Sequence, residues 1–457
     1  MTTDEATDRA TGATRPATGG AATGLWKNRS YRLLLTGATA EDVGAAVGAF
    51  AVPLAAYGTT GSVVQAGVIS FVGQLGSVLM ALPAGVIVDR VDRRRLIMIG
   101  SAVAALAWLS VVVAGLVDGL SITAPHLAAA LFVSSMVGSL MDPAGIAALH
   151  AVVPKEQLGQ AVSVAQGRDA AATLLQGPLG GLLYGMSSVL PFVVSVAGRL
   201  VSVVTTSLVR EPLNGDLGAA RAEHPLAALR EGLRYVFGVP LLRTMIWLFV
   251  LVNIVLNGMM VAINLHLVSI GTTPALIGLI NTAVGVGVLA GSFLAGVLVK
   301  RVRVGVLTAM TLGVSGVAVV AMALYPTFWG FVAALTGMMF FAPALNAGLL
   351  SYVTAITPGA VQGRMAATMG LTGLVAGPTA PLVGSLLLAS LGIGPAMWVF
   401  SAGWALLFLA LFLVRPLWHV GLPGTWAADV VEWPTPRPPS ATRSEAVRRR
   451  TSRHPRR

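Results

Sequence analysis

A dense basic segment between two long apolar runs constrains this chain more than any other feature. The charges of Gly85-Val-Ile-Val-Asp-Arg-Val-Asp-Arg-Arg-Arg95 lie between the runs 64–88 and 96–117. Each run is long enough to cross a bilayer as a helix, because about 20 apolar residues span roughly 30 Å. Short loops rich in Lys and Arg are retained on the cytosolic side of a membrane. The segment therefore predicts a membrane protein that keeps this loop in the cytosol.

The composition favours a polytopic membrane protein. Of the 457 residues, 55% are hydrophobic and 11% are charged, whereas soluble domains carry about 25% charged residues. The net charge of +12 would suit a nucleic-acid partner, but the arginines fall in loops and tails. There they set topology and contact lipid headgroups, so we expect a lipid bilayer and no nucleic acid as partner. The excess of Arg over Lys, with much Ala, Gly and Val, suggests a GC-rich bacterial genome.

Twelve apolar runs meet the length criterion for membrane helices. They fall near 33–57, 64–88, 96–117, 126–149, 162–186, 190–209, 244–268, 274–299, 305–324, 328–352, 364–390 and 394–415. Loops predicted to be cytosolic hold nearly all the basic residues, while Asp118 is the one clear charge in the loops predicted to be outside. This pattern predicts an even number of spans in a bacterial inner membrane, with both termini cytoplasmic.

The rest of the chain divides into a leader, a linker and a tail. We expect a disordered cytosolic leader at 1–24, without the features of a secretory signal. Six-helix halves are predicted at 25–210 and 244–416, joined by a linker at 211–243 and followed by a basic disordered tail at 417–457. Apolar residues repeat at helical spacing over 225–237, which fits an amphipathic helix on the inner leaflet or an ordinary linker helix.

The two halves repeat one another in their prolines. Pro143 precedes Pro178 by 35 residues (178 − 143). Pro343 precedes Pro378 by the same 35 (378 − 343). Transporters built from parallel repeats about an axis normal to the membrane show such internal similarity. The predicted fold is therefore an all-α membrane protein with twelve transmembrane helices in two pseudo-symmetric six-helix halves.

Residues 25–416 resemble the major facilitator superfamily, and within it the branch of macrolide exporters and the enterobactin exporter. The pieces that carry the resemblance are Leu25-Trp-Lys-Asn-Arg-Ser-Tyr-Arg32, Thr60-Gly-Ser62, Leu82-Pro-Ala-Gly-Val-Ile-Val-Asp-Arg90, Asp142-Pro-Ala144, Val153-Pro154 and Gly177-Pro-Leu-Gly-Gly181. In the loop signature Gly-x-x-x-Asp-Arg-x-x-Arg-Arg-Arg, this chain has Asp92 where the family most often has Gly. The resemblance implies two rocking halves around a cavity that opens to one side at a time.

The resemblance also implies a cytosolic gate. Its candidate residues are Gly85, Asp89, Arg90, Arg93, Asp142 and Arg364. Asp89 would face the N-terminus of the eleventh span near Arg364, where the helix dipole favours an anion. Arg93 would pair with Asp142 at the inner end of the fourth span. These contacts would close the gate in the outward-open state; the alternative is a loop that only sets topology.

The fifth span carries a Gly-Pro pattern that resembles the motif of superfamily antiporters. It consists of Gly177, Pro178 and Gly181. Proline removes a backbone hydrogen bond and kinks a helix, while glycine lets a neighbouring helix approach closely. The fuller motif has a glycine where this chain has Thr173. Antiport is therefore suggested, with plain helix packing as the alternative.

Three charges fall within predicted spans. They are Glu41 and Asp42 in the first span and Arg199 in the sixth. A lone charge at mid-bilayer costs at least about 2.5–3.5 kcal/mol, so such residues usually face a cavity or a partner. We interpret one of the two acids as a protonatable coupling site, with Arg199 favouring its ionised form or binding an anionic group. A static ion pair that supports packing is the alternative. The resembling branch often has its acid at the position of Ala45.

Two further polar pairs lie near membrane spans. Asn253 and Asn257 are one turn apart and could line the cavity or bond to neighbouring helices. Arg168 and Asp169, near the inner end of the fifth span, are either gating charges or a local pair that reaches cytosolic water, and we favour the local pair.

Enzyme motifs are missing from the sequence. With no cysteine, and six histidines without metal-ligand spacing, no metal site or cofactor is expected. No phosphate-cradling Gly-x-x-x-x-Gly-Lys-[Ser/Thr] loop or Gly-x-Ser-x-Gly nucleophile motif occurs either. We therefore expect a monomeric secondary transporter that exports amphiphilic small molecules, such as drugs, macrolides or siderophores, against protons. The alternatives are an uptake permease or facilitator, and a non-transporting sensor or assembly protein.

Overall fold

The computed structural model describes residues 24–214, 240–413 except Pro358, and 420–429, together with a few single positions near 234–238 and at 418. Over 359–372 it describes the backbone but not the side chains, so the side chain of Arg364 is not described. The predicted leader, nearly all of the predicted amphipathic helix at 225–237, and most of the basic tail lie outside the described residues.

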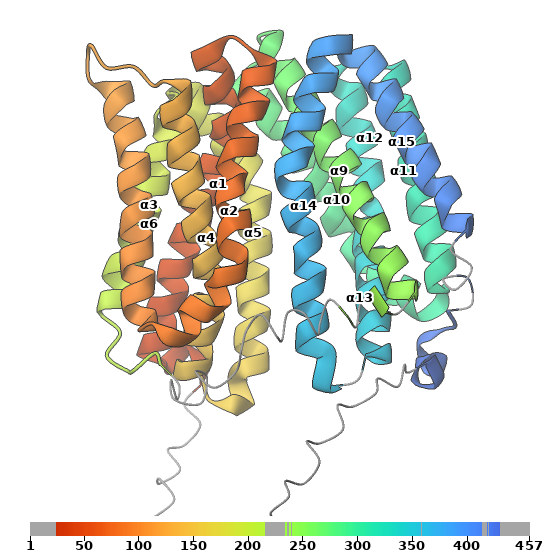
Figure 1. Cartoon of the computed structure of the whole chain (residues 1–457), viewed down its shortest axis with the longest axis horizontal. Helices are drawn as coiled ribbons and strands as arrows, with labels where there is room; N and C mark the ends of the chain where they lie inside the picture. Colours follow the sequence, from red (N-terminus) through yellow and green to blue (C-terminus); the bar gives the residue numbers. More distant parts are fainter. Residues whose placement is uncertain are drawn as a thin grey trace, which may run out of the picture.

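The N-terminal half is a bundle of long helices. A single 3-10 turn, η1 (Leu25–Lys27), precedes it, and a second, η2 (Lys155–Gln157), precedes its fifth helix. The helices are α1 (Arg29–Thr60), α2 (Val63–Arg90), α3 (Arg93–Leu116), α4 (Ala124–Val152), α5 (Leu158–Met186) and α6 (Leu190–Ser207). Figure 1 shows this bundle beside a second one built from the later part of the chain.

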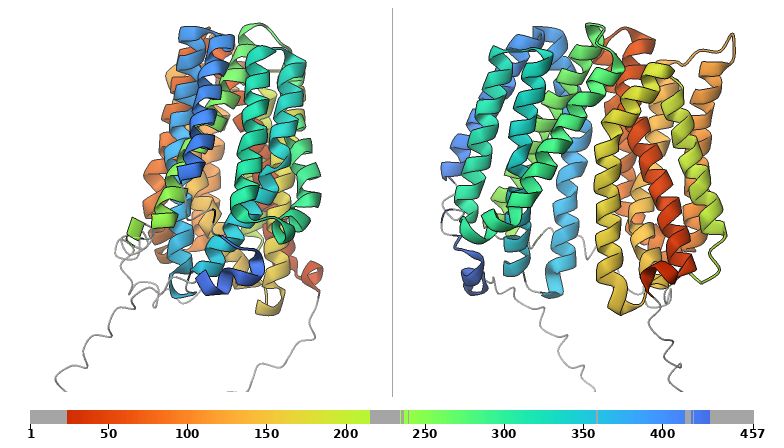
Figure 2. Two further views of the ribbon diagram at one scale, coloured as in Figure 1. Left: turned by 90° about the vertical axis from the view of Figure 1, so that its right-hand side faces the viewer. Right: turned by 180° about the vertical axis from the view of Figure 1, so that it is seen from behind.

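The C-terminal half repeats the arrangement. Its helices are α9 (Pro240–Ser269), α10 (Pro274–Arg301), α11 (Val304–Leu324), α12 (Phe328–Phe340), α13 (Ala342–Ile356), α14 (Gly359–Leu391) and α15 (Ile393–Leu413), followed by η3 (Pro423–Asp429). The views from the side and from behind in Figure 2 show that the helices of both bundles run roughly parallel to one another. We call the end where α1 begins, with Arg93 to Arg95 and Lys300 to Arg303, the basic end; it lies at the bottom of Figure 1.

Of the twelve predicted spans, eleven have described helices that are long and apolar enough to cross a membrane. The exception is α5, which runs through the predicted span 162–186. It carries Gln160, Gln166, Arg168, Asp169 and Gln176. The predicted span 328–352 is confirmed as one long apolar segment, but it is broken into α12 and α13.

Pro343 accounts for the break between α12 and α13. Proline lacks the N–H that an α-helix needs and is tolerated in the first turn of a helix. Here it stands in the first turn of α13, two residues after Phe341, which is the C-cap of α12. By contrast, α5 continues past Pro178 without a break.

Glycines set a close contact inside the N-terminal half, between α1 and α6. A Cβ atom added at Gly44 would lie 3.0 Å from the carbonyl oxygen of Val194 and 3.1 Å from the Cα atom of Ser195. At Gly198 an added Cβ would overlap the carbonyl oxygen of Ala40. Small residues allow helices in membranes to pack backbone to backbone. This contact places Arg199 of α6 beside Glu41 of α1.

The two halves meet most closely away from the basic end. An added Cβ at Gly177 of α5 would lie 2.6 Å from the Cβ of Asn281 in α10. On the other side of the molecule, an added Cβ at Gly67 of α2 would lie 3.0 Å from the carbonyl oxygen of Pro381 in α14. At Gly85, near the basic end of α2, nothing lies within 4 Å of an added Cβ. The close seams between the halves are thus on the side opposite the basic loops.

Candidate functional site

A cavity of about 440 Å³ lies within the N-terminal half. Its lining comes from α1, α3, α4, α5 and α6, and extends from Tyr31 and Thr206, near the basic end, to Ala45 and Gly138, deeper in the bundle. Six charged residues line it: Glu41, Asp42, Asp142, Arg168, Asp169 and Arg199. The three intramembrane charges predicted as coupling residues thus face one cavity, together with three more.

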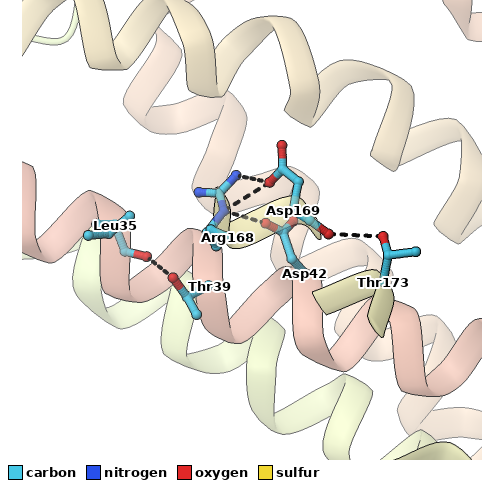
Figure 3. A network of polar contacts seen from close by, with 6 residues as sticks. All are labelled: Leu35, Thr39, Asp42, Arg168, Asp169 and Thr173. Atoms are coloured by element: carbon cyan, nitrogen blue, oxygen red, sulfur yellow. Dashed lines mark hydrogen bonds and ion pairs between the residues drawn. The ribbon is translucent and has the colours of Figure 1, made fainter. Parts of the chain in front are cut away.

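An ion-pair network joins α1 to α5 in this cavity (Figure 3). The Nε atom of Arg168 lies 2.7 Å from the Oδ2 atom of Asp42. The same guanidinium donates to Asp169 Oδ1, from Nη2 at 2.8 Å and from Nε at 3.1 Å. Thr173 donates its hydroxyl to the backbone carbonyl of Asp169 at 2.9 Å. Arg168 and Asp169 do form the local pair that we favoured, but the pair also reaches Asp42.

Arg199, which we interpreted as acting on one of the first-span acids, is not the counter-ion of Asp42, but it does lie beside Glu41. Asp42 has Arg168 as its counter-ion. Glu41 accepts a hydrogen bond from the hydroxyl of Ser101 at 3.0 Å, and among the described residues no ion pair within 4.0 Å joins it to Arg199. Neighbouring residues of a helix point about 100° apart, so the two acids face different sides of α1. The sequence could not show which basic residue approaches which acid.

Arg199 itself is held by neutral groups. Its side chain is 4% exposed, and its Nη2 atom donates to the hydroxyl of Ser134 at 2.7 Å. The indole N–H of Trp108 donates to the same hydroxyl at 3.0 Å. The Nε and Nη1 atoms of Arg199 are buried and have no hydrogen-bond partner.

The predicted pair of Arg93 and Asp142 is not formed. Arg93 donates from Nη1 to the carbonyl oxygen of Leu213 at 3.1 Å, and from its backbone N–H to Oδ1 of Asn214 at 2.9 Å. Asp142 lines the cavity instead. The expected gate belongs to a conformation closed at the basic end, whereas here the halves meet at the other side. Asp89 and Arg90 are exposed, and their gating roles, with Arg364 and Gly85, stay predictions.

Asp92 has two structural roles in this loop. One carboxylate oxygen caps α3 by accepting the backbone N–H of Arg95 at 2.9 Å. The other accepts the side-chain amide of Asn214 at 2.9 Å. These hydrogen bonds, that of Arg95 first, hold the pKa of Asp92 below its usual value.

The segment after α6, which we call the exit segment (209–214), is bound by the loop and by α1. Arg94 donates to the carbonyl oxygen of Glu211 at 2.8 Å. The hydroxyl of Ser30 bonds to the carboxylate of Glu211 and lowers the pKa of that carboxyl. Val209 and Leu213 are buried. Our sequence reasoning missed Ser30, Glu211 and Asn214, although the departure at Asp92 was a signal.

The Gly-Pro residues of α5 lie on the seam between the halves. The carbonyl oxygen of Gly278 in α10 would overlap a Cβ atom added at Gly177, and the Cα atom of Ala275 would lie 3.2 Å from one added at Gly181. The observed role of these glycines is therefore a close contact between α5 and α10. The kinking role of Pro178 stays a prediction.

The two asparagines in α9 do not line this cavity, and their predicted role in a cavity between the halves stays a prediction. Asn253 and Asn257 donate to carbonyl oxygens one turn earlier in their own helix, at 2.8 and 2.9 Å, and neither lines the cavity. The C-terminal half differs from the N-terminal half in charge as well. Between Glu231 and Asp429 the sequence has no Asp or Glu, so every carboxylate within a span lies in the N-terminal half.

Two bundles of parallel helices, with a charged cavity inside one of them, define a polytopic membrane transporter. The sequence profile of the Major Facilitator Superfamily matches residues 34–271 and 256–452. The chain therefore belongs to the major facilitator superfamily, as its loop signature and internal repeat predicted.

Relatives of established function are drug exporters. The chain is 27% identical over 399 residues to the multidrug efflux pump Tap of Mycolicibacterium fortuitum, covering 84% of this chain and 95% of that protein. It is 26% identical over 243 residues to macrolide efflux protein A of Streptococcus pyogenes, covering 52% of this chain and 58% of that protein. The predicted drug-efflux branch is thereby confirmed.

Solved structures share the fold. A bacterial homologue of the iron transporter ferroportin, in its inward-facing state, matches with a TM-score of 0.67 and 17% identity, over 86% of this chain and 99% of that one. The nucleoside transporter NupG, as a D323A mutant, matches with a TM-score of 0.68 and 9% identity, over 84% of this chain and 99% of that one. At these identities the likeness concerns the fold.

Proposed function

We propose that this protein exports amphiphilic small molecules from the cytosol by proton antiport, as a monomer in the bacterial inner membrane. The ion pair between Asp42 and Arg168 in the cavity carries this proposal. The two efflux relatives support the direction of transport. The basic end faces the cytosol with both termini, because basic loops are retained there.

The conformation fits the cytosol-facing step of such a cycle. The close seams between the halves lie away from the basic end, and the cavity begins near Tyr31 at that end. With Arg168 at 2.7 Å, Asp42 has a counter-ion in place of a proton. When the halves rock, a shift of α5 against α1 would separate the two residues and leave the carboxylate free to take up a proton from outside.

Proton movement in proteoliposomes tests the proposal. A pH-sensitive dye inside reports proton flux when macrolides or lipophilic cations are added across a pH gradient. We expect substrate-triggered flux in the wild type, its loss in Asp42→Asn, and its retention in Asp118→Asn, because Asp118 is exposed in the loop at the end opposite the basic end. Glu41→Gln is the comparison within the cavity, and we expect it to keep proton flux because Ser101 is its partner.

Other outcomes separate the alternatives. Substrate movement without protons would replace antiport by a facilitator. Substrate accumulation on the side of the basic end would reverse the direction to uptake. Flux that survives in Asp42→Asn but is lost in Glu41→Gln would move the coupling site to Glu41, and a folded protein that moves none of the compounds would favour a non-transport role.

A further inference from the structure

Arg199 presents an unusual arrangement for a buried cation. It lies in the middle of α6, is 4% exposed, and has no ion pair within 4.0 Å among the described side chains. A buried charge without a close counter-charge is strongly unfavourable, and charges inside membrane spans usually mark a substrate or ion pathway. Glu41 lies beside Arg199 but forms no ion pair with it within 4.0 Å, so an anionic group that enters the cavity would meet donors of Arg199 that are still unengaged.

The side chain is fixed in position by its neighbours. Ser134 accepts from Nη2 of Arg199 and from the indole of Trp108. Trp108 in turn stacks on Phe192, with ring centroids 5.0 Å apart and an interplanar angle of 12°. These contacts hold the guanidinium plane while leaving Nε and Nη1 without partners. A donor held in place in this way loses little conformational entropy when an acceptor binds.

The other charges of the cavity are already engaged or lie elsewhere. Arg168 pairs with Asp42 and Asp169, and Glu41 accepts from Ser101. Asp142 stands eight residues after Ser134 on α4 (142 − 134), which is about 12 Å nearer the basic end. At the inner end of the cavity Arg199 therefore has two donors that no side chain engages, with the carboxylate of Glu41 on the neighbouring helix, while Asp142 lies nearer the mouth.

We infer that the inner end of this cavity is a binding subsite for a carboxylate or similar anionic oxygen group of the transported molecule, with Arg199 as its partner. Asp142, nearer the mouth, suits a cationic group on the same molecule, so the substrate class is a zwitterionic amphiphile. This inference rests on the proposed function. Hydrogen bonds between ions of opposite charge are the strong ones, and more so in a dry site.

Two dyes that differ by one methyl ester test the subsite. Rhodamine 110 carries a free carboxylate and rhodamine 123 carries its methyl ester, on the same cationic ring system. Binding to the purified protein in nanodiscs is measured by fluorescence polarisation. We expect the wild type to bind rhodamine 110 about tenfold or more tightly than rhodamine 123, as one charged hydrogen bond provides.

The variants assign the preference to Arg199. Arg199→Gln should lose affinity for rhodamine 110 while keeping rhodamine 123 within about twofold, which also shows that the cavity is folded. Arg199→Lys should recover part of the preference. Arg243→Gln is the matched control, because Arg243 is exposed at the start of α9 and outside the cavity. If Arg199→Gln cannot be purified in a folded state, Arg199→Lys serves as the test: it should prefer rhodamine 110 over rhodamine 123 less strongly than the wild type does.

Several results would overturn the subsite. For the wild type, these results are binding of the ester as tightly as the acid or more tightly, and binding of neither dye. For Arg199→Gln, they are an unchanged preference for the acid and an equal loss of affinity for both dyes. These results test the subsite independently of the proposed export. If the wild type prefers the carboxylate dye but shows no proton flux in liposomes, the subsite is retained and antiport is rejected. If both dyes trigger proton flux that is the same in the wild type and in Arg199→Gln, antiport is retained and the subsite is rejected.

Discussion

The side-chain amide of Asn214 donates to the carboxylate of Asp92 at 2.9 Å. This hydrogen bond ties the exit segment (209–214) to the loop between α2 and α3. The same loop carries the superfamily signature, and its Arg93 and Arg94 bind backbone carbonyls of the exit segment. In this conformation, the signature loop therefore holds the start of the connection between the two halves.

Replacing Asp92 should release the exit segment. Asp92→Ala removes the cap of α3, worth about 1 kcal/mol, and a hydrogen bond worth about 0.5–1.5 kcal/mol. Because, of these two, only the hydrogen bond to Asn214 attaches the exit segment, we expect hydrogen exchange of backbone amides at 209–214 to accelerate by roughly 2–13-fold. Mass spectrometry of the detergent-solubilised protein measures this. Asp92→Asn keeps one acceptor oxygen and can cap α3 but not also accept from Asn214, so it should accelerate exchange at 209–214 while leaving the start of α3 protected. Equal acceleration in Asp118→Ala would show a global effect instead.

Acid should weaken the same attachment. The folded-state pKa values of Asp92 and Glu211 lie below their ordinary values, which are about 3.9 and 4.3. Their stabilisation is therefore fully present above the ordinary values and is lost as the pH falls through the folded-state values. Protection of 209–214, corrected for intrinsic exchange rates, should fall below about pH 4. In the Asp92→Asn, Glu211→Gln double variant, the protection at 209–214 should no longer fall with pH. If it still falls, other titrating groups cause the loss of protection.

A side chain at Gly177 should disfavour the present conformation. Gly177→Val puts atoms where Gly278 of α10 now lies, and overpacking costs about 1–3 kcal/mol. The population of the state open at the basic end should fall by roughly 5–150-fold. Because the chain has no cysteine, a single Gly85→Cys change reports this state through its labelling rate with a soluble maleimide.

Gly185→Val is the matched control for that experiment. Gly185 lies two turns further along α5, and nothing is within 4 Å of a Cβ atom added there. Its labelling rate should equal that of the parent. Faster labelling in Gly177→Val, or an equal slowing in both variants, would mean that the seam between α5 and α10 does not control opening.

Asp42 and Arg168 should show coupled stabilities. Asp42→Asn leaves Arg168 with Asp169 alone, and Arg168→Gln leaves carboxylates without a cation. Each single change removes one partner of a pair in a membrane cavity, which is more harmful than removing both. We expect the double variant to be more stable than the sum of the single effects implies, by about 0.5–3 kcal/mol. Thermal unfolding of the four proteins measures this coupling, and additive effects would exclude it.

The sequence predicted the fold well because lipid leaves few options for a chain of long apolar runs. Most helices extend one to five residues beyond the predicted spans, as in α1 (Arg29–Thr60) for 33–57 and α14 (Gly359–Leu391) for 364–390. Polar residues at helix ends, such as the cap Asn28 of α1, add turns that apolar length does not reveal. The break at Phe341 was missed because both of its sides are apolar.

The site was predicted in its residues but not in its pairings. Intramembrane charge is rare enough to draw attention to Glu41, Asp42 and Arg199, and all three line one cavity. Which base meets which acid depends on helix rotation, and α5 brought Arg168 rather than Arg199 to Asp42. Likewise, Arg93 was assigned to Asp142 by analogy, whereas an exit segment with no motif of its own supplies its acceptors here.

The confinement of carboxylates to one half has an electrical consequence. The potential across a membrane does work only on charges that lie within its thickness, at about 2.3 kcal/mol per elementary charge per 100 mV. In the C-terminal half, basic residues such as Lys300 and Arg301 lie at helix ends, and no acid occurs between Glu231 and Asp429. Among the described residues, the membrane potential would therefore act mainly on the charges around Asp42, Arg168 and Arg199, and we expect the N-terminal half to account for most of any voltage dependence of transport.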